Sequence, residues 1–227
     1  MNEEGFAADE TARERLVSAA ISAFAAKGFH GTTTRDIANS AGLSPAGVYV
    51  HYASKEELLF RISEEGHRGV LAEMRAVSAR AQAPAGKLVA LVRAFVLWHA
   101  ERHTRARVVN YELAALTPEH YAAINRIRRQ ITSELERVVE AGQLDGSFDV
   151  ADVRMTTGSL LSLGIDITRW YLDSGHITPE QVADHHVHLA LRIVGARPRA
   201  RPPASGPRVP GSARSPEVDA PRVEDLA

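Results

Sequence analysis

The sequence predicts an all-α protein with a small N-terminal part and a larger helical part. Apolar residues recur at three- and four-residue steps along most of the chain, as in Leu16, Ala20 and Phe24, and no segment has the alternation of a strand. Pairs that begin helices, a Ser or Thr followed by Pro, separate the periodic segments at 44–45, 117–118 and 178–179. The spacing of the apolar residues and the positions of the helix-starting pairs therefore both predict helices along the chain.

The composition is that of a soluble globular protein and excludes several classes of function. Of 227 residues, 44% are hydrophobic and 24% charged, and no apolar run approaches the roughly 20 residues of a membrane-spanning helix. The chain has no cysteine, which excludes disulfides, thiol catalysis and cysteine-ligated zinc. The polar, acidic start does not resemble a secretory signal, so we expect a cytoplasmic protein without membrane contact.

The N-terminal part is predicted to contain three helices and the start of a fourth. The first runs from Thr11 to Lys27 and ends at Gly28, and a short second helix begins near Thr34 and ends before Gly42. Ser44 caps the third helix, and Ser54 with Glu57 suggests a capping box for the fourth. So many caps in so few residues predict short, closely packed helices.

The second and third helices have the spacing of a helix-turn-helix, whose second helix enters the major groove of DNA. The small residues Ala46 and Gly47 allow that helix to approach the groove, and Tyr49 can donate to a phosphate oxygen. The same pattern also occurs in ordinary helical hairpins, in which Tyr49 or Tyr52 anchors the core. The first 61 residues have no excess of basic over acidic side chains, so strong electrostatic attraction to DNA is not expected.

The surrounding sequence favours the DNA-binding interpretation. The stretch "AAISAFAAKGFHGTTTRDIANSAGLSPAGVYVHYASKEELL" resembles the N-terminal pattern of the TetR family of transcriptional regulators, including "G-x-x-x-T-T-x-x-I-A", "A-G-x-S", "G-x-x-Y-x-H-Y" and "S-K-E-E-L-L". The resemblance implies an all-helical homodimer with an N-terminal DNA-binding domain and a helical ligand-binding and dimerisation domain. Carried over by position, the DNA-contact candidates are Thr34, Arg35, Ser44, Pro45, Ala46, Tyr49, His51, Tyr52 and Lys55.

The resemblance also suggests a domain organisation. We expect a flexible segment over 1–10, the helix-turn-helix domain over 11–56, the larger domain over 57–195 and a disordered Pro/Arg-rich tail over 196–227. Helices of the larger domain are predicted near 54–80, 86–101, 104–115, 118–141, 149–173 and 179–195. The last two are expected to dimerise, since "SLLSLGIDI" is too apolar for a helix with one wet face and Gly158 and Gly164 permit close helix approach.

A ligand pocket is expected between the middle helices, where polar residues interrupt apolar faces. Each candidate is also compatible with a capped, paired or exposed side chain. The candidates are Trp98, His99, His103, Arg107, Asn110, Tyr111, Thr157, Asp166, Arg169 and Trp170. The "RWY" arrangement is similar to TetR members that sense acyl-coenzyme A thioesters in lipid or steroid breakdown. This resemblance implies that Arg126, Arg128 or Arg129 binds the coenzyme phosphates, and an exposed basic helix face explains these residues equally well.

The sequence thus predicts a ligand-responsive repressor that binds a palindromic operator as a dimer, with no cofactor and no catalytic or metal-ligating residues. Two alternatives remain: a helical enzyme that uses His99, His103 and Glu112, and an interaction protein that has lost DNA binding. The histidines of "HHVH" at 185–188 lack the further ligands that a metal site would need.

Overall fold

The computed structural model describes residues 3–172 and 175–196, with side chains from residue 11 onward. Within these ranges the chain is helical: α1 (Glu3–Lys27), α2 (Thr34–Ser40), α3 (Pro45–His51), α4 (Lys55–Ser78), α5 (Pro84–Glu101), α6 (His103–Tyr111), a 3-10 turn η1 (Leu113–Ala115), α7 (Pro118–Leu144), α8 (Val153–Trp170) and α9 (Pro179–Ile193). No strand occurs in this described part, so the predicted all-α class is confirmed.

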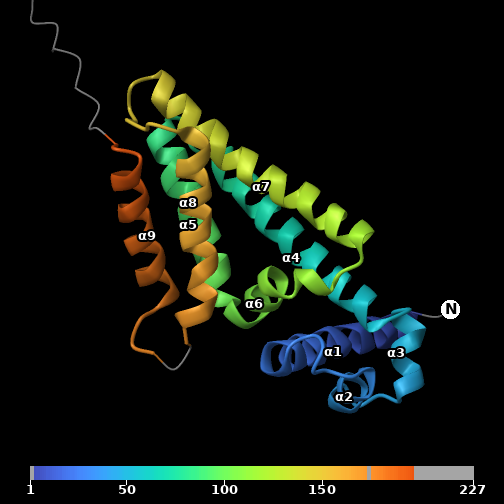
Figure 1. The fold of residues 1–227 in the computed structure, drawn as a ribbon. Coiled ribbons are helices and arrows are strands. Elements are labelled where there is room, and N and C mark those ends of the chain that lie inside the picture. The colour runs from blue at the N-terminus through green and yellow to red at the C-terminus, as the bar shows by residue number, and fades with distance from the viewer. Residues whose placement is uncertain (1–2, 173–174, 197–227) are drawn as a thin grey trace, which may run out of the picture.

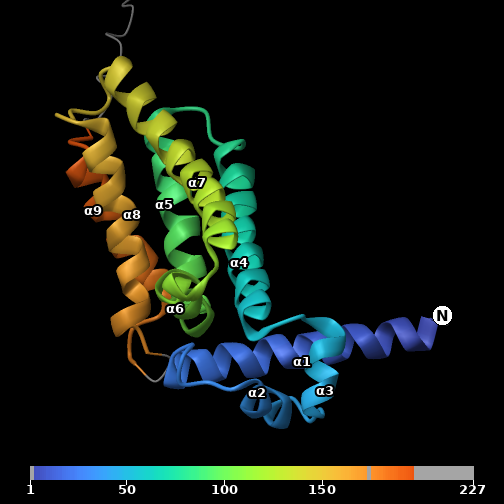
Figure 2. The ribbon, with the colours of Figure 1, turned by 45° about the vertical axis from the view of Figure 1, so that its right-hand side comes forward.

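The helices form two layers that meet along α1. In Figures 1 and 2, α1 lies crosswise at the base of the bundle formed by α4, α5 and α7–α9, with α2 and α3 on its far side. Helix α4 rises from α3 into the bundle, and α6 lies between the bundle and α1. The helix-turn-helix is therefore at one end of the molecule.

Two apolar cores hold the molecule together. The larger core is centred on α5, which packs against α4, α7, α8 and α9 and buries Leu88, Leu91, Phe95 and Trp98. Each fully buried side chain of this size stabilises the fold by about 1.5–3 kcal/mol. The smaller core joins α1–α4, but it also includes Val108 to Ile124 from α6, η1 and the start of α7. Hydrophobic packing thus crosses the predicted boundary at 56/57.

Most helix boundaries follow their capping signals. Thr33, Ser44, Thr117 and Thr178 each accept a hydrogen bond from the first turn of the following helix, and Gly28 and Gly42 adopt positive φ. The predicted capping box at Ser54 forms only in part, because the Glu57 carboxylate accepts from the N–H of Ala53.

Other boundaries differ from the prediction. Helix α1 begins at Glu3, within the segment predicted to be flexible (1–10), whereas α8 begins at Val153 instead of 149. The later start of α8 arises because Phe148 and Val150 are buried in the preceding loop and Asp152 supplies the cap. A helix predicted over 104–115 is split into α6 and η1 at Glu112.

Close approach of α5 and α8 depends on Gly164. A Cβ at this position would lie 2.7 Å from the ring of Phe95. Gly164 thus permits the close helix approach expected from sequence, here between α8 and α5, whereas a Cβ at Gly158 would meet nothing within 4 Å. In the described residues no helix is long and apolar enough to cross a membrane. The predicted tail lies outside the described residues apart from Ala196.

Candidate functional site

The helix-turn-helix is built from local capping interactions and one buried contact surface. Thr33 and Asp36 form a reciprocal capping box at the start of α2, and Gly42 makes the turn with φ of 69°. The hydroxyl of Ser44 accepts from the N–H of Gly47 at 3.1 Å and begins α3. Ile37 and Val48 are fully buried, so each helix has one face fixed on the core and the other free.

The free face of α3 carries four of the nine predicted DNA-contact residues. Ser44, Pro45, Ala46 and Tyr49 are exposed, and Arg35 is exposed on α2. The ring of Tyr49 is 56% exposed, which is unusual for a large aromatic side chain that has no external partner. Thr34 and His51 are half-buried at the edges of this face. The sequence analysis missed Val50, whose side chain is 78% exposed beside Tyr49.

Two residues predicted to contact phosphates make their observed contacts within the chain. Tyr52 is only 9% exposed and belongs to the smaller core, and burial raises the pKa of its phenol. The ammonium of Lys55 donates to the carbonyl oxygens of Phe29 and Thr32 at 2.7 and 2.6 Å, and lies 4.1 Å from the centroid of the Phe29 ring. Its charge therefore stabilises the loop between α1 and α2.

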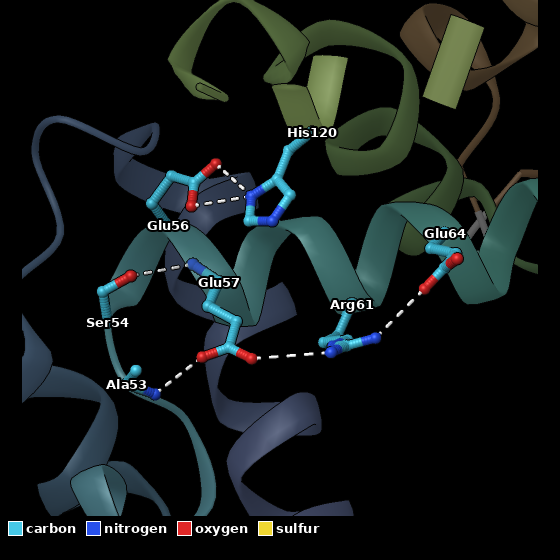
Figure 3. A network of polar contacts seen from close by, with 7 residues as sticks. All are labelled: Ala53, Ser54, Glu56, Glu57, Arg61, Glu64 and His120. Carbon is cyan, nitrogen blue, oxygen red and sulfur yellow. Dashed lines mark hydrogen bonds and ion pairs between the residues drawn. The ribbon is translucent and has the colours of Figure 1, made fainter. Parts of the chain in front are cut away.

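A second set of contacts ties the first turn of α4 to the larger half. The carboxylate of Glu56 accepts from the N–H of Thr117 at 2.9 Å. It also accepts from Nδ1 of His120 at 2.9 Å, as Figure 3 shows. The His120 ring stacks on Phe60 with centroids 3.9 Å apart. A further contact joins the end of α6 to the loop after α1, where the carboxylate of Glu112 accepts from the N–H of Phe29 at 3.1 Å. These contacts join α6 and α7 to the DNA-binding end.

An inner cavity of about 200 Å³ lies among α4–α8. Its walls are largely apolar, with Val70, Phe95, Trp98, Val109, Ile131, Leu161 and Ile165. The polar groups on the walls come from His67, His99, Asn110, Arg128, Thr132 and Ser162. A mostly apolar cavity with a few polar groups is typical of a small-molecule site.

Two buried histidines line this cavity in a defined tautomer. Nδ1 of His67 lies 2.8 Å from the carbonyl oxygen of Ser63, and Nδ1 of His99 lies 2.7 Å from that of Phe95. A carbonyl oxygen cannot donate, so each Nδ1 carries the proton. Burial lowers the pKa of both imidazoles to about 4, and they are neutral at pH 7. Nε2 of His99 is 3.4 Å from the amide nitrogen of Asn110, whereas Nε2 of His67 is buried without a hydrogen-bond partner.

An outer depression of about 620 Å³ adjoins the cavity. The two share Asn110 and Arg128 as wall residues, so these side chains stand between the inner space and the surface. Exposed Tyr111 and Tyr121 line the outer part. The arrangement suits a ligand with a small apolar end and a larger polar end.

Comparisons with known proteins assign the family. Residues 16–62 match the family described as "Bacterial regulatory proteins, tetR family", and residues 81–194 match "Tetracyclin repressor-like, C-terminal domain". A crystal structure of a regulatory protein of the tetR family from Rhodococcus RHA1 is 44% identical, with a TM-score of 0.78, over 82% of this chain and 98% of that one. The chain belongs to the TetR family.

Other TetR-family relatives are more distant. The transcriptional repressor KstR2 of Rhodococcus jostii is 28% identical over 182 residues, which are 79% of this chain and 89% of that protein. The structure of the ketosteroid transcriptional regulator KstR2 of Mycobacterium tuberculosis is 25% identical, with a TM-score of 0.74, over 79% of this chain and 93% of that one. Their similarity spans both halves of this TetR-family regulator.

The residues that the sequence predicts for one ligand pocket lie in several different places in the structure. Trp98, His99 and Asn110 line the inner cavity of the TetR-family fold, and Tyr111 lines the outer depression. The remaining candidates lie elsewhere: His103 faces a groove beside α1, Arg107 and Arg169 line a separate depression, Thr157 is buried beside the cavity wall, and Asp166 and Trp170 are exposed on α8. A helical period identifies a face, but it does not specify which neighbour that face meets.

The sequence analysis missed His67 altogether. It lies on α4, which the pattern presented as a connecting helix, yet Ser63 and His67 occupy the same stripe as the buried Leu59, Val70 and Met74. Polar side chains on an apolar helical stripe are a signal that could have located the cavity.

The predicted "HHVH" segment forms no metal cluster among the residues that this TetR-family structure describes. Asp184, the carboxylate nearest to it in sequence, pairs instead with Arg93 on α5.

Proposed function

We propose that this TetR-family regulator is a repressor that binds a palindromic operator as a homodimer, with α3 in the major groove. The proposal rests on the exposed, partly apolar face of α3. Tyr49 and Val50 are exposed there, on a domain that is otherwise well packed. The name of the repressor KstR2 supports the direction of regulation. Two α3 helices of a dimer would lie about 34–36 Å apart to reach successive major grooves. Such a regulator works in the cytoplasm, where its DNA is.

The proposed dimer interface lies on α8 and α9. Their outer faces carry large exposed apolar side chains, among them Met155 (69% exposed), Leu163 (42%), Trp170 (48%) and Ile193 (39%). Apolar surface of this kind on two neighbouring helices is typical of an interaction site. A second copy that covers the same face would give a two-fold symmetric bundle.

A small, largely apolar ligand in the inner cavity is proposed to release the DNA. The cavity is formed by the helices that also reach the DNA-binding end through Glu56 and Glu112. An acyl-coenzyme A thioester fits the shape of the site, since the inner cavity would hold the acyl group and the outer depression the coenzyme. Arg128 at the neck suits an acyl oxygen or a phosphate.

The enzyme alternative receives no support from the geometry. His99 lines the inner cavity, His103 the groove beside α1, and Glu112 a third depression, where its carboxylate accepts from Phe29. General acid and base groups must reach the same substrate atoms. The second alternative, an interaction protein without DNA binding, is tested directly by DNA retention.

The test is a gel-shift assay with the DNA upstream of the protein's own gene at two salt concentrations. We expect salt-sensitive retention of a specific fragment by the wild type, and loss of retention in Tyr49→Ala with the dimer intact. Leu144→Ala is the control, since this 88% exposed side chain ends α7 at the end of the bundle farthest from α3 (Figure 1). Retention of no fragment would refute DNA-binding function, and an unchanged shift with Tyr49→Ala would refute the assignment of α3.

A further inference from the structure

We propose that the effector of the inner cavity is a hydroxylated acyl compound whose hydroxyl donates to Nε2 of His67 and whose acyl oxygen accepts from Arg128. The inference rests on the proposed ligand-responsive function and specifies the chemistry of its ligand. It depends on two side chains that face the same space from α4 and α7.

His67 presents a free hydrogen-bond acceptor to a ligand in the cavity. Its side chain is 5% exposed, its Nδ1–H is used by Ser63, and its Nε2 is a buried lone pair without a partner. Leaving such an acceptor unpaired costs free energy that a donor in the cavity would recover. The neighbouring His99 differs, because the amide of Asn110 already faces its Nε2.

Arg128 limits the charge of the ligand's donor group and indicates which second polar group the ligand has. It lines the cavity half-buried, and within the described part of the chain its guanidinium makes no hydrogen bond or ion pair. A cation this close disfavours an ammonium group as the donor to His67 and favours a neutral donor, of which a hydroxyl is the simplest. The guanidinium itself donates only, and so it favours a carboxylate or a thioester carbonyl at the neck of the cavity.

The volume limits the size of the acyl group. A cavity of about 150 Å³ holds benzene, so the 200 Å³ present here holds a group of about six to eight carbon atoms. The outer depression beyond Arg128 leaves room for a coenzyme, and the chemistry is therefore shared by a free hydroxy acid and its thioester.

The experiment measures binding to the full chain by isothermal titration calorimetry. The probes are hexanoyl-, 3-hydroxyhexanoyl- and 6-hydroxyhexanoyl-coenzyme A, each also as the free acid. We expect one hydroxylated probe to bind about tenfold more tightly than its parent, as one buried hydrogen bond predicts. His67→Leu should abolish this preference, whereas His67→Gln, whose amide oxygen can replace Nε2 as acceptor, should retain part of it.

Arg128→Gln provides an independent measurement. It should weaken every acyl probe and leave the ratio between hydroxylated and parent probes unchanged, since the hydroxyl contact is on α4. Thermal melting checks that each variant is folded, and if His67→Leu does not fold, the ratios in His67→Gln and Arg128→Gln decide. The acid and thioester arms identify which form is bound.

Three outcomes overturn the inference. Equal affinity for hydroxylated and parent probes overturns it while the proposed function stands, provided that these probes release the operator. A hydroxyl preference that persists in His67→Leu assigns the contact to another residue. If no probe binds to a protein that still retains its operator, the acyl class proposed as effector fails together with this inference.

Discussion

The buried histidines His67 and His99 should make the stability of the protein depend on pH between about 6.5 and 4. Both imidazoles are more than nine-tenths buried, and burial lowers the pKa of each from 6.5 to about 4. As the pH falls through this range, the unfolded chain binds protons that the folded protein excludes. The stabilisation is therefore complete above pH 6.5 and is lost progressively toward pH 4.

The size of the effect follows from the pKa values. At pH 4.5 one such histidine has lost about 2–3 kcal/mol of its contribution to the free energy of unfolding. Urea denaturation of wild type and His67→Leu at pH 7.5 and 4.5 measures this loss. Carboxylates titrate equally in both proteins, so the wild type should lose about 2–3 kcal/mol more than the variant. Equal losses would show that His67 is charged or solvated in the folded protein at pH 4.5 and would refute the lowered pKa.

Two further perturbations test the junction and the interface. Glu56→Ala should lower the free energy of unfolding by about 1–2 kcal/mol and reduce the effect of ligand on operator affinity, because the Thr117 N–H and His120 lose their acceptor. Glu56→Gln, which keeps an acceptor oxygen, should lose less, and identical melting and gel-shift results for the two variants would contradict the role of the carboxylate. Leu163→Glu should convert the dimer to a monomer in size-exclusion chromatography with light scattering, and an unchanged dimer would exclude the outer face of α8 as the interface.

The N-terminal half was largely predictable because its signals are local. A cap, a proline and a glycine lie within a few residues of the helix ends that they determine, as at Ser44, Pro45 and Gly42. For Tyr52 the sequence left a DNA contact and a core position open, and the structure shows the core position. The contacts of Lys55 were not predictable in this way. Lys55 is directed by carbonyl groups of Phe29 and Thr32, more than twenty residues earlier, and only the packing of α4 on the α1–α2 loop brings them together.

The cavity was harder to predict, because it is formed by contacts between helices that lie far apart in the sequence. Asn110 and Trp98 were predicted because polar and aromatic residues interrupt apolar faces there, but the pattern could not pair α6 with α4 and α7. His67 therefore went unnoticed, although its position on the buried stripe of α4 carried the information. Arg128 was linked to a coenzyme by resemblance alone, and the structure places its side chain on the cavity wall.

The same two helices join the cavity to the DNA-binding end. On α4, His67 is eleven residues from Glu56, a rise of about 16 Å, and on α7, Arg128 is eight residues from His120, a rise of about 12 Å. A ligand that bridges His67 and Arg128 would change the separation of α4 and α7 at one point, while the contact between Glu56 and His120 constrains it at another. Because a ligand shifts an equilibrium only by its difference in affinity for the two conformers, the bridging contacts must form better when the two helices have moved. Reduced ligand response in Glu56→Ala with unchanged ligand affinity would place the coupling at this contact, whereas an unchanged response would place it at Glu112.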